Sequence, residues 1–212
     1  MLWWTIIIAV IAAALAYGFW DHLRQSRRLA GLFAPLAVEF GGELVKPSLL
    51  AFPQLRFEVD CGRAHLGAMA NSGAIGPVRG PFTFVELTLA GDTGQDLVAE
   101  RGKSVQRLAG HLAGHLVGRV VPRGRARARI KTGHAEFDEA FWLDGGDHQF
   151  ASGLFDRGLR QKLLDTRLPG LEIRLRGDRI SAHCDGIVET RRDLEALIDI
   201  AVDLAQRCPI ER

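Results

Sequence analysis

The residues best suited to chemistry lie in the middle of the chain and combine imidazole and carboxylate groups at regular spacing. They are His111, His115, His134, Glu136 and Asp138. The first two are four positions apart, which would place two metal ligands on one face of a helix, but no glutamate stands between them and no third ligand is clear. The other three alternate beside Phe137 and Phe141, and we favour a solvated turn above an aromatic core. We therefore predict no metal, no cofactor and no catalytic residue. A membrane-tethered enzyme or ligand sensor at these five residues is the alternative function.

A second unusual segment carries basic residues at every other position. These residues are Arg123, Arg125, Arg127, Arg129 and Lys131. In an extended strand all five charges would point from one face. Such a face can contact anionic lipid headgroups, bind an acidic partner, or stay in water and protect an edge strand from pairing. We predict no nucleic-acid binding, because aromatic residues are missing from the segment and the net charge of the chain is only +2.

The element that positions the rest of the chain is an uncharged, apolar run from residue 2 to residue 20. A helix of this length spans about 28 Å, close to the roughly 30 Å of a bilayer core. Aromatic residues stand at both ends of the run, and arginines follow it. They are Trp3, Trp4, Tyr17 and Trp20, then Arg24, Arg27 and Arg28. These features predict a transmembrane anchor with the N-terminus outside and the C-terminal part in the cytoplasm, because positive charge stays inside.

A cleaved signal peptide is the main rival to an anchor, since Ala14-Leu15-Ala16 fits a cleavage pattern. A secretory signal needs basic residues before the apolar run, however, and none is present. The run also contains small residues four positions apart, such as Ala14 and Gly18, which let a second helix approach closely. We expect a membrane-protein partner to bind through the span or through the helix that follows it.

The composition is that of a folded globular domain, with 25% charged and 47% hydrophobic residues among 212. The three cysteines, Cys61, Cys184 and Cys208, are too few and too far apart for a disulfide framework or a zinc site. Unpaired cysteines are typical of the reducing cytoplasm, in agreement with the predicted orientation.

Residues 21–42 predict a juxtamembrane amphipathic helix, because apolar residues such as Leu29, Phe33 and Leu36 recur at helical spacing. Pro35 either kinks this helix or opens its second half, and Gly41-Gly42 ends it. Its apolar face can lie on the membrane or cover a sheet, and we favour the sheet.

Residues 43–131 predict a β-rich meander. Alternating apolar residues mark strands at 54–60, 63–70, 81–90 and 95–101, joined by short turns apart from the Gly/Pro loop at 71–80. A change to helical period predicts a helix near 104–120, which glycines weaken, before the basic strand.

Residues 132–208 predict the other half of the same domain, with helices at 149–155 and 157–167, a hairpin around Gly177-Asp178 and a C-terminal amphipathic helix. Asp147, Asp156 and Thr190 stand where the N-caps of these helices belong.

This second half contains the motif Glu136-Phe137-Asp138-Glu139-Ala140-Phe141, followed by Leu-Leu-Asp-Thr-Arg at 163–167. With these motifs the chain resembles a widespread type of uncharacterised bacterial protein that has a single N-terminal span and an F-D-x-x-F segment in a C-terminal α+β domain. The resemblance covers residues 24–208 in pattern and 136–205 in motif, and it does not include the basic strand. It implies a fold and membrane attachment, with the two phenylalanines as core aromatics, and it implies no activity.

Together these features predict an α+β protein of the bacterial inner membrane. A single transmembrane helix (1–20) precedes an antiparallel-sheet domain with covering helices and a C-terminal amphipathic helix. The preferred function is that of a non-catalytic interaction or scaffold module, acting as an accessory subunit of a membrane protein complex.

Overall fold

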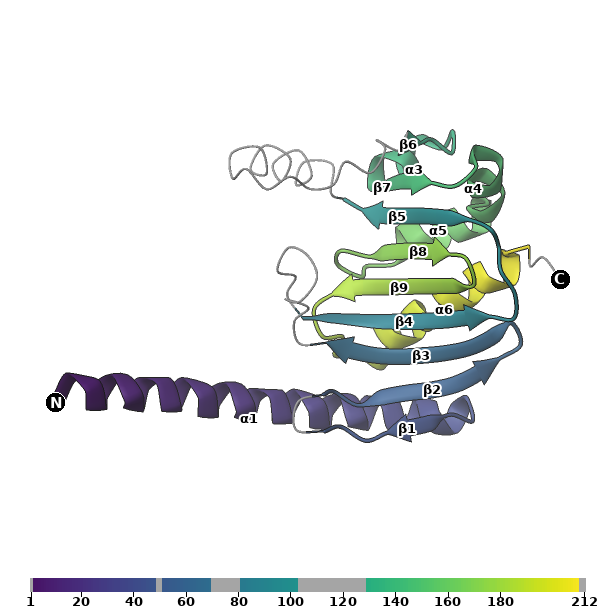
Figure 1. Cartoon of the computed structure of the whole chain (residues 1–212). Helices are drawn as coiled ribbons and strands as arrows, with labels where there is room; N and C mark the ends of the chain where they lie inside the picture. The colour runs from purple at the N-terminus through teal and green to yellow at the C-terminus, as the bar shows by residue number, and fades with distance from the viewer. Residues whose placement is uncertain (1, 49–50, 70–80, 103–128, 210–212) are drawn as a thin grey trace.

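The computed structural model describes residues 2–48, 51–69, 81–102 and 129–209, and it has an α+β fold (Figure 1). A long N-terminal helix precedes one nine-stranded sheet in which all neighbouring strands are antiparallel, in the order β1-β2-β3-β4-β9-β8-β5-β7-β6. The strands are β1 (Glu43–Val45), β2 (Gln54–Val59), β3 (Gly62–Met69), β4 (Phe82–Leu89), β5 (Asp96–Arg101), β6 (Arg129–Ile130), β7 (Phe141–Gly145), β8 (Glu172–Arg176) and β9 (Arg179–Asp185). The helices are α1 (Leu2–Glu39), α3 (Ala135–Ala140), α4 (His148–Leu154), α5 (Arg157–Asp165) and α6 (Arg191–Arg207).

Helix α1 is one uninterrupted helix of 38 residues, about 57 Å long. The division into a span at 1–20 and a separate helix at 21–42 is therefore not a structural boundary. Pro35 lies inside the helix and does not break it. A proline removes the hydrogen bond to the carbonyl four residues earlier, here Gly31, and both residues are exposed, so water can replace that bond. As predicted, the helix ends at Gly41-Gly42: Gly41 has a φ of 61°, and the Gly42 amide donates to the Ala37 carbonyl at 2.7 Å.

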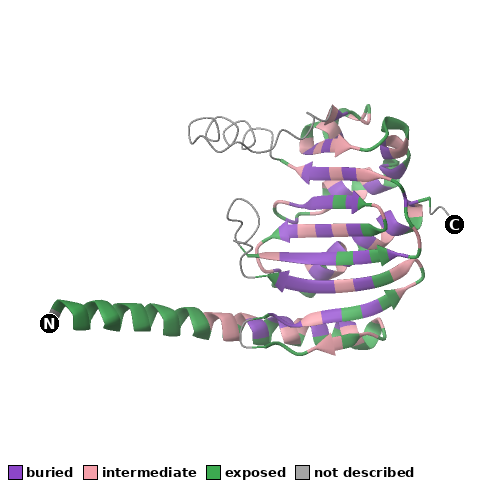
Figure 2. Cartoon of the chain, in the orientation of Figure 1, coloured by how far each residue is buried: buried purple, intermediate pink, exposed green. Residues whose placement is uncertain are grey.

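The two halves of α1 have opposite surroundings. Figure 2 shows the first half exposed along its length and the second half lying against the sheet. In that second half Leu29, Phe33 and Leu36 are at most 1% exposed, and beyond the end of α1 the Phe40 ring stacks on Phe57 of β2 at 4.9 Å. The prediction that this segment covers the sheet is confirmed.

The core lies between the sheet and the helices packed on one of its faces, α6 among them (Figure 1). A row of buried apolar residues crosses eight strands in register. In the order of the sheet, from β2 across to the edge strand β6, the residues of this row are Leu55, Leu66, Val85, Ala182, Ile173, Ala99, Leu143 and Ile130. Their neighbours in sequence point to the opposite face, which the described helices leave open.

The predicted hairpins are confirmed, but the predicted four-stranded meander is wrong. Strands β2 and β3 pair through the turn at Asp60-Cys61, and β8 and β9 pair through Gly177-Asp178. The β8–β9 hairpin lies between β4 and β5, with Leu87 opposite Ile180 and Ala99 opposite Ile173. Strands from both halves of the chain thus form a single sheet. The predicted helix near 104–120 lies outside the described residues.

The helices of the second half begin at the predicted caps. The side chains of Asp147, Asp156 and Thr190 accept hydrogen bonds from the backbone amides three residues later, at the starts of α4, α5 and α6. The F-D-x-x-F aromatics are core residues, as expected: Phe137 stacks on Phe141 at 4.9 Å, and both are at most 1% exposed.

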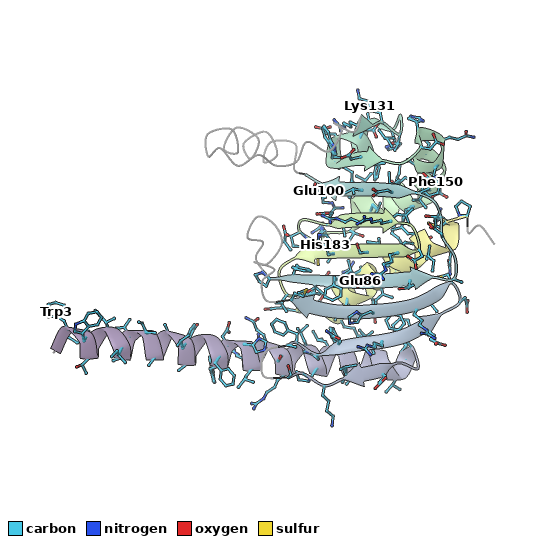
Figure 3. All side chains as sticks on the ribbon, viewed as in Figure 1. Trp3, Glu86, Glu100, Lys131, Phe150 and His183 are labelled. Carbon is cyan, nitrogen blue, oxygen red and sulfur yellow. The ribbon has the colours of Figure 1, made fainter. Side chains whose placement is uncertain are left out.

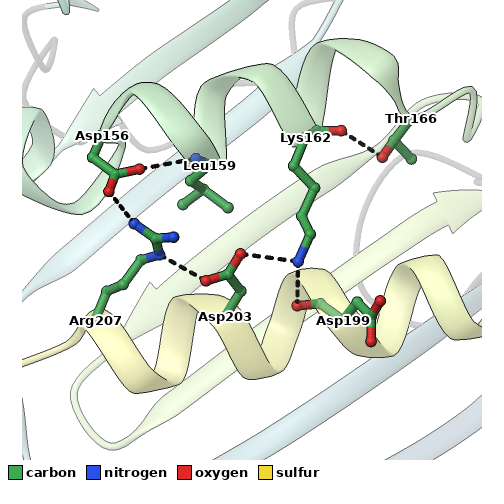
Figure 4. A network of polar contacts seen from close by, with 7 residues as sticks. All are labelled: Asp156, Leu159, Lys162, Thr166, Asp199, Asp203 and Arg207. Atoms are coloured by element: carbon green, nitrogen blue, oxygen red, sulfur yellow. Dashed lines mark hydrogen bonds and ion pairs between the residues drawn. The ribbon is translucent and has the colours of Figure 1, made fainter.

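Helices α5 and α6 are also joined by charged groups (Figure 4). The Asp203 carboxylate accepts a hydrogen bond from Lys162 Nζ at 2.9 Å and another from Arg207 Nε at 2.8 Å. Arg207 continues the network to Asp156, the N-cap of α5. The network fixes the relative position of the two helices on their solvent side.

Candidate functional site

The exposed half of α1 is a large apolar surface with aromatic residues at both ends. Trp3 and Trp4 are 78% and 71% exposed, and Tyr17 and Trp20 are 69% and 55% exposed. In the described part of the chain this is the one helix that is long and apolar enough to cross a membrane. Tryptophan and tyrosine at the ends of such a helix suit the two membrane–water interfaces. The structure therefore contains a candidate span in which the predicted interface aromatics are accessible.

The predicted arginines follow within two turns of this surface. Arg24, Arg27 and Arg28 are exposed, and the Arg24 guanidinium lies over the Trp20 ring at 5.6 Å. An aromatic ring and a cation held together suit the headgroup layer, where the ring meets apolar groups and the cation meets phosphate.

A groove of about 400 Å³ lies beside α1, one to three turns beyond Trp20. The α1 wall is formed by Gln25, Arg28, Leu29, Gly31 and Leu32, and the opposite wall by Ile187, Val188 and Glu189. The floor is apolar, with Leu29 1% and Val188 7% exposed. The polar groups Gln25, Arg28 and Glu189 lie on the walls. Such a groove can hold an apolar segment of a partner between groups of opposite charge.

The wall opposite α1, formed by residues 187–189, is held to the sheet by hydrogen bonds. The buried Thr83 hydroxyl of β4 donates to the Gly186 carbonyl at 3.0 Å and accepts from the Val188 amide at 2.9 Å. Sequence reasoning missed this groove, because its walls come from residues 25–32 and 187–189. No local pattern indicates that these two segments meet.

The open face of the sheet contains a buried charged cluster that sequence reasoning also missed. Glu172 and Glu100 are 1% and 3% exposed and lie directly opposite each other on β8 and β5. Glu172 accepts a hydrogen bond from Arg174 Nε, and its other oxygen is 3.2 Å from His183 Nε2. Figure 3 shows Glu100 and His183 near the end of the sheet from which α1 projects. The alternation of Glu172 and Arg174 in a strand was the only signal in the sequence. Both oxygens of Glu172 have protein partners, so this buried carboxylate is paired within the sheet.

Of the residues predicted for the alternative site, the three that the structure describes, His134, Glu136 and Asp138, do not form a common site. Asp138 accepts hydrogen bonds from the Thr132 amide at 2.9 Å, the Thr132 hydroxyl at 2.8 Å and the Gly133 amide at 3.1 Å. Its carboxylate therefore holds the turn before α3. Glu136 is exposed, and His134 is the N-cap residue of α3. The predicted pair His111 and His115 lies outside the described residues. Within the described ranges no group of three or more His, Cys, Asp and Glu side chains could hold a metal ion.

Only the end of the predicted basic strand can be located. Arg129 belongs to β6, at the edge of the sheet. Its guanidinium lies over the Trp142 ring at 4.7 Å and donates to the Asp138 carbonyl. Lys131 is exposed. Arg123, Arg125 and Arg127 lie outside the described residues, so a common face for the five charges stays a prediction from the sequence.

No protein-family model matches this sequence, and no curated protein matches it. Among solved structures, the fold is similar to the crystal structure of the mycobacterial trehalose monomycolate transport factor A, TtfA. The two chains are 11% identical, the TM-score is 0.55, and the match covers 89% of this chain and 98% of that chain. At this identity the likeness shows a shared fold, an α+β domain whose sheet and helices are arranged in a similar way.

Proposed function

We propose that the protein is a membrane-anchored, non-catalytic interaction or scaffold module, an accessory subunit of a bacterial membrane protein complex. The observation that carries this proposal is the double character of α1. Its first half exposes apolar residues on all sides, and its second half is part of the domain core. An apolar surface of this size is stable in lipid and unfavourable in water. The similarity in fold to a mycobacterial transport factor supports an accessory role.

The proposal includes the orientation and the lipid contacts. Arg24, Arg27 and Arg28 follow the span, which supports an N-terminus outside and a cytoplasmic domain at the inner membrane. The three cysteines are free, as is usual in a reducing compartment. Each basic residue near an anionic leaflet contributes about 1 kcal/mol of attraction. The three juxtamembrane arginines would supply that contact, together with the basic residues 123–131.

The resemblance to single-span proteins with an F-D-x-x-F domain agrees with this assignment, since it implies membrane attachment without an activity. An enzyme or sensor site at residues 134–138 receives no support, because Asp138 is used by the turn before α3.

The experiment is extraction of the tagged full-length chain from native membranes in a mild detergent, followed by size-exclusion chromatography and mass spectrometry. An alkaline wash of the membranes comes first, and we expect the protein to stay in the pellet as an integral protein. We then expect it to elute in a complex with at least one other membrane protein. Release by the alkaline wash would contradict the anchor. Elution as a lone monomer or homodimer would contradict the accessory role.

Orientation has its own test. Cys61 is half-buried at the turn between β2 and β3, so a thiol reagent can reach it. A membrane-impermeant maleimide should leave Cys61 unlabelled in intact spheroplasts and label it after lysis. Labelling before lysis would reverse the orientation.

A further inference from the structure

We infer that the groove beside α1 receives a membrane-spanning helix of another protein, which packs along α1 in the bilayer and continues out of it into the groove. This inference rests on the proposed function and names the kind of partner and its place of contact.

The first argument is a continuous stripe along α1 that leads into the groove. Its residues follow one another at steps of three or four positions. They are Ile7, Val10, Ala14, Gly18, Asp21, Gln25, Arg28 and Leu32. At 3.6 residues per turn they lie within an arc of about 80° on one side of the helix. The last three of them form part of the groove wall. A helix that packs on this stripe inside the membrane is therefore aligned with the groove when it leaves the membrane.

The second argument is the size of the side chains along that path. Ala14 and Gly18 permit close approach within the bilayer, where helices associate through small residues four positions apart. In the groove, the α1 wall contains Gly31, and a Cβ added there would meet no heavy atom within 4 Å. The space beside α1 thus remains open to a second backbone well beyond the span. Because α1 is uninterrupted, the orientation of the stripe relative to the groove is fixed.

The third argument is charge, which favours a helix over an anionic lipid. Arg28 and Glu189 line opposite walls, both are exposed, and neither forms an ion pair with another described residue. A lipid phosphate attracted by Arg28 would also meet the Glu189 carboxylate. A helix can present an acidic residue to Arg28 from one side and a basic residue to Glu189 from the other, while its apolar residues cover Leu29 and Val188.

Charge also argues against a second copy of this chain as the occupant. In a parallel dimer with its two-fold axis along α1, each residue of the stripe faces its own counterpart. The two Arg28 side chains would meet at the same level, and two like charges would repel each other. A different protein avoids this repulsion.

The contact is tested by photo-crosslinking of the full-length chain in native membranes. The probe p-benzoyl-phenylalanine replaces Ala14 or Gln25 on the stripe, with Ala12 and Val38 as control positions on other faces of the same helix. We expect both stripe positions, and neither control, to crosslink to one polypeptide. The crosslinked peptides should map to a transmembrane segment of that protein and to the residues that follow it.

A groove-filling variant provides the second measurement. Gly31→Leu adds a side chain at the groove, where its Cβ meets no heavy atom within 4 Å, and replaces glycine by a better helix former, so we expect folding to be retained. The control is Ala34→Leu, which adds the same side chain at an exposed position of α1 that does not line the groove. We expect Gly31→Leu to reduce recovery of the crosslinked partner about tenfold, equivalent to about 1.4 kcal/mol, and Ala34→Leu to recover it fully.

The outcomes separate this inference from the proposed function. If the wild-type chain recovers a partner and Gly31→Leu recovers it equally well, the groove is not the contact, and the accessory role stands. Crosslinks from position 25 that lead only to lipid, or only to a second copy of this chain, also overturn the inference. If the wild-type chain recovers no partner at all, both the inference and the proposed function fail.

Discussion

Removal of the charge at Asp203 should weaken the contact between α5 and α6 and lower the free energy of unfolding, and the contacts of this carboxylate give the size of the effect. The carboxylate bonds to Lys162 at 2.9 Å and to Arg207 at 2.8 Å, and its side chain is 20% exposed. An ion pair on a protein surface contributes about 0.2–1 kcal/mol, and a hydrogen bond to a charged group somewhat more when it is partly buried. Two such contacts give about 1–2 kcal/mol for Asp203→Asn. In a chain of this size that corresponds to a decrease of about 3–6 °C in Tm.

The effect should depend on pH with a definite sign. Burial by itself raises the pKa of the Asp203 carboxyl, but the hydrogen bonds and charges of Arg207 and Lys162 outweigh burial and lower that pKa below its usual value of 3.8. A carboxyl with a lowered pKa in the folded state stabilises the fold above its unfolded pKa and loses this contribution as the pH falls through the folded pKa. The Tm difference between wild type and Asp203→Asn should therefore be constant near neutral pH and shrink below about pH 3.8.

The assay is thermal unfolding of the full-length chain in detergent, followed by near-ultraviolet circular dichroism. Asp199→Asn is the matched control, because Asp199 lies one turn away on α6, is exposed, and contributes only its backbone carbonyl to Lys162 (Figure 4). Equal Tm values for the two variants, or a difference that grows as the pH falls, would refute the reasoning.

Three further predictions concern packing, backbone and thiols. Phe137→Ala removes a fully buried ring and should cost about 3–5 kcal/mol in the free energy of unfolding, measured by chemical denaturation; a loss below 1 kcal/mol would contradict its place in the core. Gly62→Ala should destabilise the chain more than Gly94→Ala in the same measurement. Both residues have positive φ, but a Cβ at Gly62 would lie 1.9 Å from the Thr88 carbonyl oxygen, whereas one at Gly94 meets nothing within 4 Å. At pH 8 a maleimide should label Cys61 in the folded protein and Cys184 only after unfolding, because burial raises the pKa of the Cys184 thiol to about 12; labelling of both at equal rates would contradict this.

Local signals predicted most of the individual elements. The cap at Thr190 and the turn at Gly177-Asp178 are determined by the chemistry of a few neighbouring residues. The apolar face of the second half of α1 was equally clear, because its period is that of a helix. Strand β7 was missed, since it follows α3 without a turn residue: Phe141 is both the C-cap of α3 and the first residue of the strand.

The order of the strands could not be predicted in the same way. The pairing of β4 with β9 joins residues about a hundred positions apart, such as Phe84 and His183. Short turns favour pairing of successive strands, and this preference led to the incorrect meander. The groove could not be predicted for the same reason, because one of its walls comes from residues 25–32 and the other from residues 187–189. The aromatic and basic residues of α1, in contrast, were visible from composition and position alone.

The uninterrupted α1 has a consequence for how the domain can move. With the proposed anchor, a flexible linker would let the domain tumble relative to the membrane, whereas one continuous helix fixes the rotation of the domain about the helix axis and its distance from the membrane. Each residue of an α-helix turns the chain by about 100° and advances it by 1.5 Å. One residue inserted next to Asp21 would therefore rotate the whole sheet by about 100° around the helix axis, and the groove would face away from the proposed partner. An insertion of seven residues returns the groove to within about 20° of its original direction and moves the domain about 10 Å further from the first half of α1. The number of residues between the two halves of α1 therefore sets the direction in which the groove faces, whatever the identity of those residues.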